Sequence, residues 1–428
     1  MDTWQTSRVE QTRKSERRRD GVWFSRLWQG PWRRLCAGFD DLRHSPPGNR
    51  PALDVLRSLA VLLVFLYHIQ SSAPHALRIQ KVPFVQFGWT GVDLFFVLSG
   101  LLIGGQLWKE LKRNGTVKVG RFILRRGFRI WPLYYLVVAY LLAQQVFGAR
   151  HPHGLWLDAI FLSNYYFLFP VGGHEVGGGW SLSIEEQFYL VVPILLAVGA
   201  RVIRPKLLVH LALAWLIALP LIRYLTTLKL TDAEAIHTAI YFPFQTHSDG
   251  LAVGLLLAWL LAWKPEVLLI GRWMDALLIL AFLGGFCLWY VVSLTFLFSI
   301  VALSLGALTL LLLRLSRGML FGSAVFYVIS RLSYGVYLLH PGVVSHIMAN
   351  RQHVFGEGFG AYVVAFVLGG SASLALAFLT FSFVELPFLK LRDRLIVKND
   401  SAELALVDPP NRLKRLFKLR ESHWRHLY

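Results

Sequence analysis

Apolar segments of about twenty residues recur through most of the chain, and they restrict its possible folds more than any other feature. They lie between residues 53 and 383 and carry few charged side chains. A helix of this length spans the hydrocarbon core of a bilayer and satisfies its own backbone hydrogen bonds there. We therefore predict an all-α, polytopic transmembrane bundle of about ten helices. The predicted spans are 53–69, 90–108, 128–147, 182–200, 207–226, 240–263, 273–292, 296–313, 325–347 and 360–383.

Positive charge is distributed unequally over the two sides of such a bundle. The chain holds 44 lysine and arginine residues. With the amino terminus in the cytoplasm, 37 of them fall on inner segments, only 6 on outer ones, and Arg57 lies within a span. The positive-inside rule favours this orientation. We therefore predict a multi-pass protein of the cell (inner or plasma) membrane with both termini cytoplasmic.

Three parts follow from this layout: a basic tail (1–50), a membrane domain (51–395) and a second basic tail (396–428). The first tail interleaves arginines with aromatic residues, as Trp32, Arg33 and Arg34 do, which is typical of a segment lying on an anionic inner leaflet. A net charge of +19 would suggest nucleic acid in a soluble protein. Because the tails flank a membrane domain, we expect lipids as partners and no nucleic acid.

Two smaller features complete the layout. The apolar segment 155–169 is interrupted by Asp158 and Asn164, so we expect a re-entrant or interfacial part of an outer loop rather than a span. Cys36 lies in a tail and Cys287 in an apolar run. This usage indicates neither a disulfide framework nor a metal site.

One predicted span, 53–69, carries two ionisable side chains, Arg57 and His68. They share a helical face and lie roughly 16 Å apart along the axis. Ionisable groups inside a membrane helix are costly and usually face a polar cavity. The alternative is an arginine that reaches the helix end and a histidine hydrogen-bonded within the bundle.

Residues 91–100, Gly-Val-Asp-Leu-Phe-Phe-Val-Leu-Ser-Gly, open the second predicted span. Asp93 falls near the outer end, at the depth of His68, where a carboxylate–imidazole pair is chemically sensible. The alternative is that Asp93 caps the start of its helix. Ser99 and Gly100 allow helices to approach closely, and we assign them no catalytic role.

Arg126 and Arg129 stand at the cytoplasmic border of the third span, at a depth similar to that of Arg57. Three guanidinium groups at one depth are typical of a site that binds phosphates through paired hydrogen bonds. Ordinary anchoring by positive charge on the inner side is the alternative.

Glu185 and Glu186 open an apolar helix from the outer side, within the aromatic segment 180–189. Negative charge is favourable at a helix N-terminus, but two carboxylates together suggest a polar cavity. Further polar residues fall in or beside the later spans: His247, Asp249, Tyr334, Tyr337, His340 and Glu385. This number of polar groups inside spans predicts a bundle built around a polar central cavity.

Together these motifs resemble the integral-membrane acyltransferase family 3, which includes O-acetylases of bacterial O-antigen and other surface glycans. The similarity covers about residues 51–395 and rests on Arg57-x10-His68, residues 91–100, Arg126-x-x-Arg129 and residues 180–189. The sequence departs from the family at Val55, where glycine is frequent, and at His247, where arginine is frequent. The second departure puts in doubt a phosphate-binding role at that position.

The resemblance implies transfer of an acyl group, usually acetyl from acetyl-CoA, to a hydroxyl acceptor such as a saccharide, with an essential arginine–histidine pair. We accordingly predict that Arg57, Arg126 and Arg129 bind the CoA phosphates. His68 is the predicted general base, and Asp93 and Glu185 are the other predicted catalytic residues. The predicted substrate-binding residues are Trp180, Glu186, Tyr189, Asp249, Tyr334 and His340. No metal is expected.

Two other functions fit the same residues. In a two-step version of the reaction, His68 or a hydroxyl residue forms an acyl-enzyme that passes acetyl across the membrane. A secondary transporter also carries charges inside its membrane helices, although no inverted repeat is evident here.

Overall fold

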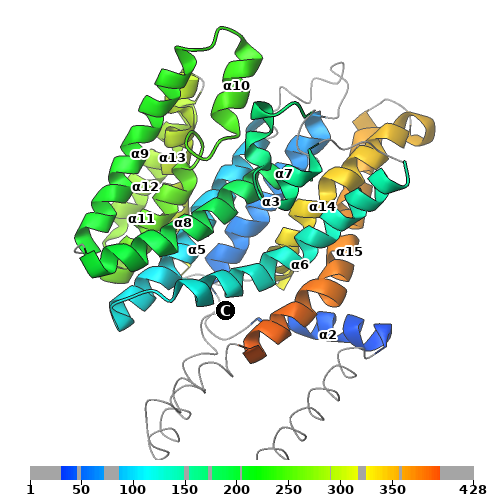
Figure 1. Ribbon diagram of the computed structural model, residues 1–428, viewed down its shortest axis with the longest axis horizontal. Coiled ribbons are helices and arrows are strands. Elements are labelled where there is room, and N and C mark those ends of the chain that lie inside the picture. Colours follow the sequence, from blue (N-terminus) through cyan, green and yellow to red (C-terminus); the bar gives the residue numbers. More distant parts are fainter. Residues whose placement is uncertain are drawn as a thin grey trace, which may run out of the picture.

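The computed structural model of the chain is a bundle of helices with one short helix lying across its lower end (Figure 1). The structure describes residues 30–45, 50–71, 86–148, 154–171, 176–202, 205–289, 291–316, 324–355 and 359–395. These ranges contain helices and no strand, so the predicted all-α class is confirmed.

The elements, in chain order, are α2 (Pro31–Arg43), α3 (Pro51–Ser71), η3 (Phe87–Trp89), α5 (Thr90–Asn114), α6 (Val119–Val146), α7 (Leu155–Ala159), η4 (Ser163–Leu168), α8 (Gly179–Val202), α9 (Pro205–Thr227), α10 (Ala233–Tyr241), α11 (Asp249–Trp263), η5 (Pro265–Leu269), α12 (Arg272–Leu288), α13 (Leu294–Leu315), α14 (Ala324–Phe355), α15 (Phe359–Thr380) and the π-helical η6 (Phe381–Glu385).

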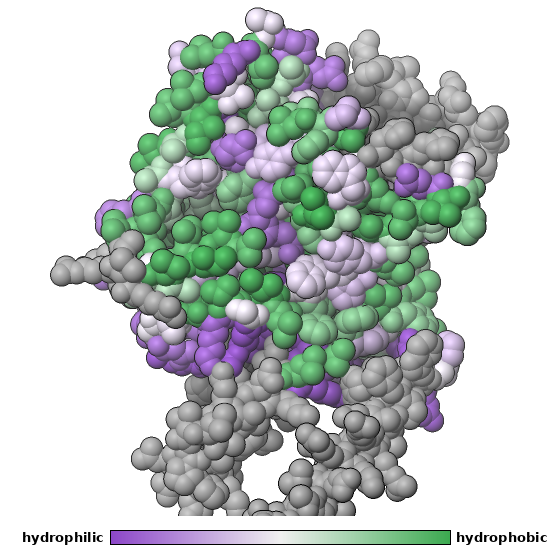
Figure 2. All heavy atoms as spheres, in the orientation of Figure 1, coloured by the Kyte–Doolittle hydropathy of each residue, from purple (hydrophilic) through white to green (hydrophobic). Residues whose placement is uncertain are grey.

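Six helical segments within the described ranges are long and apolar enough to cross a membrane: Pro51–Ile69, Phe87–Asn114, Gly179–Ala200, Leu207–Thr227, Leu294–Leu315 and Val363–Leu395. Figure 2 shows that apolar residues cover most of the middle of this face, with polar residues gathered toward its lower and upper ends and a smaller group of them between. This pattern is what a bilayer-embedded bundle requires. The polytopic architecture is therefore confirmed, whereas the predicted number of about ten spans is not.

The predicted span 240–263 is wrong at its start. The structure has α10 ending at Tyr241 and α11 beginning at Asp249. Pro243 lies between them and has no backbone N–H to continue a helix. Its carbonyl instead accepts hydrogen bonds from the backbone N–H groups of Thr246 and His247, which closes a turn. Segment 155–169 contains only the short helices α7 and η4, so the prediction that it does not form a span is confirmed.

Close packing of α5 against α11 sets the rotation of α5 within the bundle. A Cβ atom on Gly100 would lie 2.2 Å from the carbonyl oxygen of Leu251, and one on Gly254 would lie 2.2 Å from that of Val97. Only glycine allows the two backbones to approach so closely. Residues 93, 97, 100 and 104 of α5 share one helical face, so this contact directs Asp93 toward α11.

The structure describes part of the first tail and none of the second. Helix α2 contains Trp32, Arg33 and Arg34 of the first tail, and the predictions for residues 1–29 lie outside the described residues. The second tail, 396–428, lies wholly outside them.

Candidate active site

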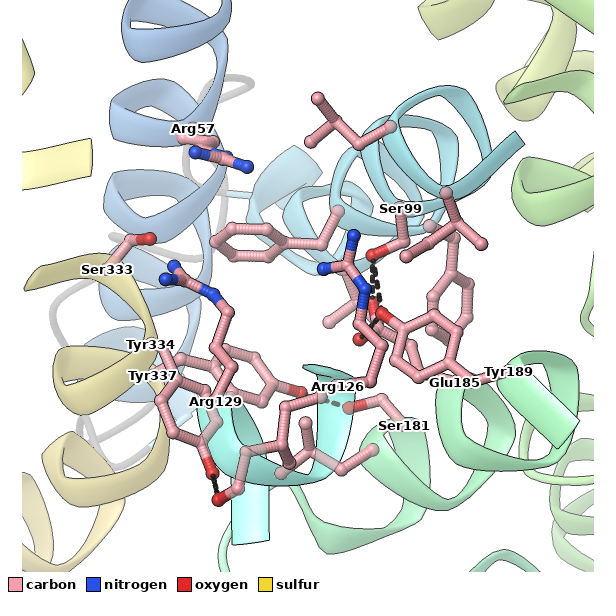
Figure 3. A pocket seen from close by; sticks show the side chains of 17 residues that line it. Arg57, Ser99, Arg126, Arg129, Ser181, Glu185, Tyr189, Ser333, Tyr334 and Tyr337 are labelled. Carbon is pink, nitrogen blue, oxygen red and sulfur yellow. Dashed lines mark hydrogen bonds between the residues drawn. The ribbon is translucent and has the colours of Figure 1, made fainter. Parts of the chain in front are cut away.

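A cavity of about 110 Å³ lies in the centre of the bundle, between α3, α5, α6, α8 and α14. Figure 3 shows side chains from these helices converging on it. Its polar lining residues are Arg57, Ser99, Arg126, Arg129, Ser181, Glu185, Tyr189, Ser333, Tyr334 and Tyr337. The predicted polar central cavity is therefore present. The three predicted phosphate-binding arginines all line it.

The guanidinium groups of Arg57 and Arg129 point into the same space (Figure 3). Within the part of the chain that the structure describes, neither group has a direct hydrogen-bond or ion-pair partner. Arg126 lies beside them, with its guanidinium 5.9 Å from the centre of the Tyr189 ring. A guanidinium that is removed from bulk water and makes no hydrogen bond is costly, even with a carboxylate nearby, as Asp54 is for Arg57 and Glu385 for Arg129. The arrangement is therefore suited to an anion that hydrogen-bonds to several arginines at once.

Glu185 lies on the opposite wall of the cavity and accepts two hydrogen bonds from neighbouring hydroxyl groups. The Ser99 hydroxyl donates to Oε1 at 2.6 Å, and the Tyr189 hydroxyl donates to Oε2 at 2.7 Å. The sequence analysis assigned Ser99 only to helix packing and so missed this contact. Glu185 therefore lines the same cavity as the three arginines, whereas His68 does not line it.

His68 lies farther along α3 and contacts His340 of α14. The Nδ1 atom of His340 is 2.9 Å from the carbonyl oxygens of Val336 and Tyr337, which can only accept a hydrogen bond. In a neutral imidazole, Nδ1 of His340 therefore carries the proton and Nε2 is an acceptor. That Nε2 lies 3.3 Å from Nδ1 of His68.

The same reasoning assigns the tautomer of His68. Its Nδ1 lies 2.9 Å from the carbonyl oxygen of Val64, so Nδ1 donates to that oxygen and to Nε2 of His340. Nε2 of His68 then carries the lone pair, which is the form a general base requires. His340 is thus a partner of His68 in this structure, whereas the sequence analysis assigned it to substrate binding.

Asp93 has a different partner from either one considered in the sequence analysis. Its Oδ1 lies 3.0 Å from Nε2 of His247, and both side chains are fully buried. At the start of α5 no side-chain capping hydrogen bond is present in the described residues. Neither the pairing with His68 nor the capping of the helix start is found, because the glycine contacts between α5 and α11 turn Asp93 toward α11.

His247 is also enclosed by its surroundings. Its Nδ1 lies 2.5 Å from the carbonyl oxygen of Tyr241, and Trp180 stacks on its ring at 5.7 Å. Trp180, a predicted substrate-binding residue, is thus a buried wall of this pair rather than a lining residue of the cavity.

Asp249 forms a buried ion pair in place of the predicted substrate contact. Its Oδ2 accepts from Nη1 of Arg223 at 2.8 Å, and both side chains are fully buried. Arg223 also donates to the carbonyl oxygens of Thr295 and Thr246 and to the Ser299 hydroxyl. The pair ties α9, α11 and α13 together and does not line the cavity.

Two further predicted substrate residues lie near the cavity. The Tyr334 hydroxyl lines it and donates to the carbonyl oxygen of Ile130 at 2.7 Å. Glu186 accepts from Nε1 of Trp131 at 3.2 Å through Oε2, while its buried Oε1 has no hydrogen-bond partner among the described residues.

Within the described ranges no three histidine, cysteine, aspartate or glutamate side chains come together as metal ligands.

Comparison with known proteins identifies the family. The model of the family described as an acyltransferase domain, Acyl_transf_3, matches residues 50–382. The chain belongs to this acyltransferase family. It is 31% identical over 224 residues to the peptidoglycan O-acetyltransferase OatA of Listeria monocytogenes serovar 1/2a, a match that covers 49% of this chain and 33% of the relative.

It is also 26% identical over 384 residues to the O-acetyltransferase OatA of Staphylococcus aureus strain NCTC 8325, which covers 80% of this chain and 58% of the relative. The acyltransferase chain thus spans little more than half the length of that relative. No solved structure matches it.

The cavity also contains residues that the sequence analysis did not assign to it. Ser181 and Tyr337 share a hydrogen bond on the cavity wall, and Ser333 lies nearby. Tyr337 was recognised as a polar residue within a span, but serines carry no such signal. A hydroxyl inside an apolar helix usually bonds to its own backbone, so only the packing shows that it faces a cavity.

Proposed function

We propose that this acyltransferase moves an acetyl group from cytoplasmic acetyl-CoA to a hydroxyl group of a saccharide acceptor in the cell membrane, with both termini in the cytoplasm. The names of the two relatives support O-acetylation as the reaction class. Acetyl-CoA as donor and a glycan as acceptor are our proposals. The basic tails, in this proposal, lie on the anionic lipids of the inner leaflet.

The observation that carries the proposal is the pair Arg57 and Arg129, which face one cavity without a direct partner in the described residues. Coenzyme A carries several phosphate groups, and the planar guanidinium binds phosphate through two parallel hydrogen bonds. Arg126, from the same helix as Arg129, adds a third donor beside Tyr189. The donor phosphates therefore bind at the end of the cavity toward α2, on the cytoplasmic side.

The thioester is delivered to His68 along the same helix. Arg57 and His68 lie roughly 16 Å apart by the helical rise, and the pantetheine arm extends along α3 between them. Nε2 of His68 takes the proton from the acceptor hydroxyl while its oxygen attacks the thioester carbonyl. The C–S bond breaks, and the CoA thiolate leaves with the proton from His68. His340 holds His68 in the required tautomer throughout.

A two-step version of this reaction is favoured by one contact. Ser99 lies in the cavity with its hydroxyl hydrogen-bonded to Glu185. In this version Glu185 takes the Ser99 proton and Oγ attacks the thioester carbonyl. The C–S bond breaks, which leaves an O-acetyl serine, and the departing CoA thiolate takes the proton from Glu185. Mass spectrometry of protein incubated with acetyl-CoA and no acceptor decides between the two: an acetyl group on the Ser99 peptide supports two steps, and an unmodified peptide supports direct transfer.

The main test uses the purified chain in detergent with acetyl-labelled acetyl-CoA, an oligosaccharide acceptor and no ion gradient. We expect labelled acetyl on the acceptor and free CoA in equal amounts. A secondary transporter would release no acetyl group under these conditions, so absence of transfer and of CoA release would contradict the proposal. The native acceptor is found by comparing the O-acetyl content of surface glycans from a deletion strain and its parent.

A further inference from the structure

Helix α2, which belongs to the first tail, packs against the end of the bundle at which Arg331 lies. It lies beneath α14 and α15, across the lower end of the bundle (Figure 1). Leu42 is buried with Leu332 and Phe381, and a Cβ on Gly38 would lie 2.1 Å from Oγ of Ser382. The helix is therefore closely packed against the bundle rather than resting loosely below it.

This packing places one carboxylate of α2 on an arginine of α14. Oδ2 of Asp41 accepts from Nε of Arg331 at 3.0 Å and from its Nη2 at 3.0 Å. The two side chains are 29% and 26% exposed, so water reaches the pair. An ion pair in such a position is weak and can exchange its anion.

Arg331 also lies near the three cavity arginines, Arg57, Arg126 and Arg129, which together with it form what we call the arginine cluster. It lies one helical turn from Tyr334 on α14, on the side toward α2, and Tyr334 lines the cavity. Its charge acts on both Arg57 and Arg129, the two cavity arginines that have no direct partner in the described residues. The cluster thus extends from the cavity to the cytoplasmic surface, and Arg331 is its outermost member.

We propose that Arg331 is a fourth arginine of the donor-phosphate site, and that the Asp41 carboxylate occupies it until a phosphate of the acyl donor displaces it. Donor binding and the contact between α2 and α14 then compete for the same guanidinium. The inference rests on the proposed function, because it takes the anion to be a phosphate of coenzyme A.

The two partners of the ion pair make opposite predictions. Asp41→Asn removes the competing charge, so CoA should bind about two- to fivefold more tightly, which corresponds to the usual strength of a partly exposed pair. Arg331→Gln removes a phosphate ligand, so CoA should bind about fivefold more weakly or worse. If the pair only held α2 in place, both variants would change CoA affinity in the same direction.

The experiment is calorimetric titration of CoA into the full chain in detergent, for the wild type, each single variant and the double variant. Asp40→Asn is the matched control, since Asp40 lies on the exposed face of the same helix. In the Arg331→Gln background, Asp41→Asn should have no further effect. An undiminished effect there, unchanged affinity in either single variant, or a tighter complex with Asp40→Asn as well would overturn the inference.

Arg129→Gln separates this inference from the proposed function. Weaker CoA binding in Arg129→Gln, with no change in the Asp41 and Arg331 variants, would overturn only the role of Arg331. A wild-type chain that binds no CoA would overturn both.

Discussion

Replacement of His68 by asparagine distinguishes a catalytic histidine from a structural one. Asparagine keeps a similar size and part of the hydrogen bonding to Val64 and His340, but it cannot accept a proton at neutral pH. Positioned proton transfer contributes about 10²- to 10⁴-fold to a rate, so acetyl transfer should fall by that factor. Coenzyme A affinity should remain unchanged, because His68 does not line the arginine cavity.

The assay pairs two measurements on the same detergent-purified protein: the initial rate of acetyl transfer and the Kd of CoA. His237→Asn is the control, since it makes the same replacement on α10, in an exposed histidine that does not line the cavity. A His68→Asn variant that turns over within about threefold of the wild type would remove proton transfer by His68 from the mechanism. Loss of CoA binding together with activity would show instead that His68 supports the fold.

Four other expectations follow from the geometry. Arg129→Lys keeps the charge but loses the paired hydrogen bonds, so the KM for acetyl-CoA should rise about tenfold with little change in kcat; a lowered kcat at unchanged KM would contradict a binding role. His340→Asn should lower kcat less than His68→Asn does and leave the donor KM unchanged, and steady-state kinetics that show the reverse would argue against a positioning role. Gly254→Ala places a Cβ 2.2 Å from the carbonyl oxygen of Val97, so thermal unfolding in detergent should show a loss of about 1–3 kcal/mol, and an unchanged transition would mean that α5 and α11 are farther apart. In a cysteine-free background, Gly115→Cys should react with a membrane-impermeant reagent only after lysis and Asp232→Cys in intact cells; the opposite pattern would invert the topology.

The membrane architecture and the arginine cluster were accessible from the sequence. A long apolar segment has few alternatives to a membrane helix, because its backbone must satisfy its own hydrogen bonds in lipid. The depth of a side chain then follows from its position along the helix. Arg57, Arg126 and Arg129 were assigned to one depth in this way, and the structure brings all three to one cavity.

The partners of the other polar residues were decided by tertiary packing. His68 lies in the last turn of α3 and Asp93 in the first turn of α5, yet Asp93 pairs with His247 and His68 with His340. Depth is a property of one helix, whereas the direction of a side chain depends on the rotation of that helix against its neighbours. Gly100 and Gly254 set that rotation for α5 by allowing it to approach α11.

The same distinction explains Asp249 and Arg331. An intramembrane carboxylate indicates a buried polar contact, but the sequence does not reveal whether the contact is a substrate or, as here, Arg223 from a helix packed beside it. In the sequence, Arg331 resembles any other positive charge near a helix end, and only the packing of α2 shows that Asp41 lies against it. The sequence by itself determined that the chain is a polytopic helical bundle and that Arg57, Arg126 and Arg129 share one depth, because those properties depend on local periodicity and transfer energy. The structure alone decided which of them meet, because that depends on contacts between helices that are far apart along the chain.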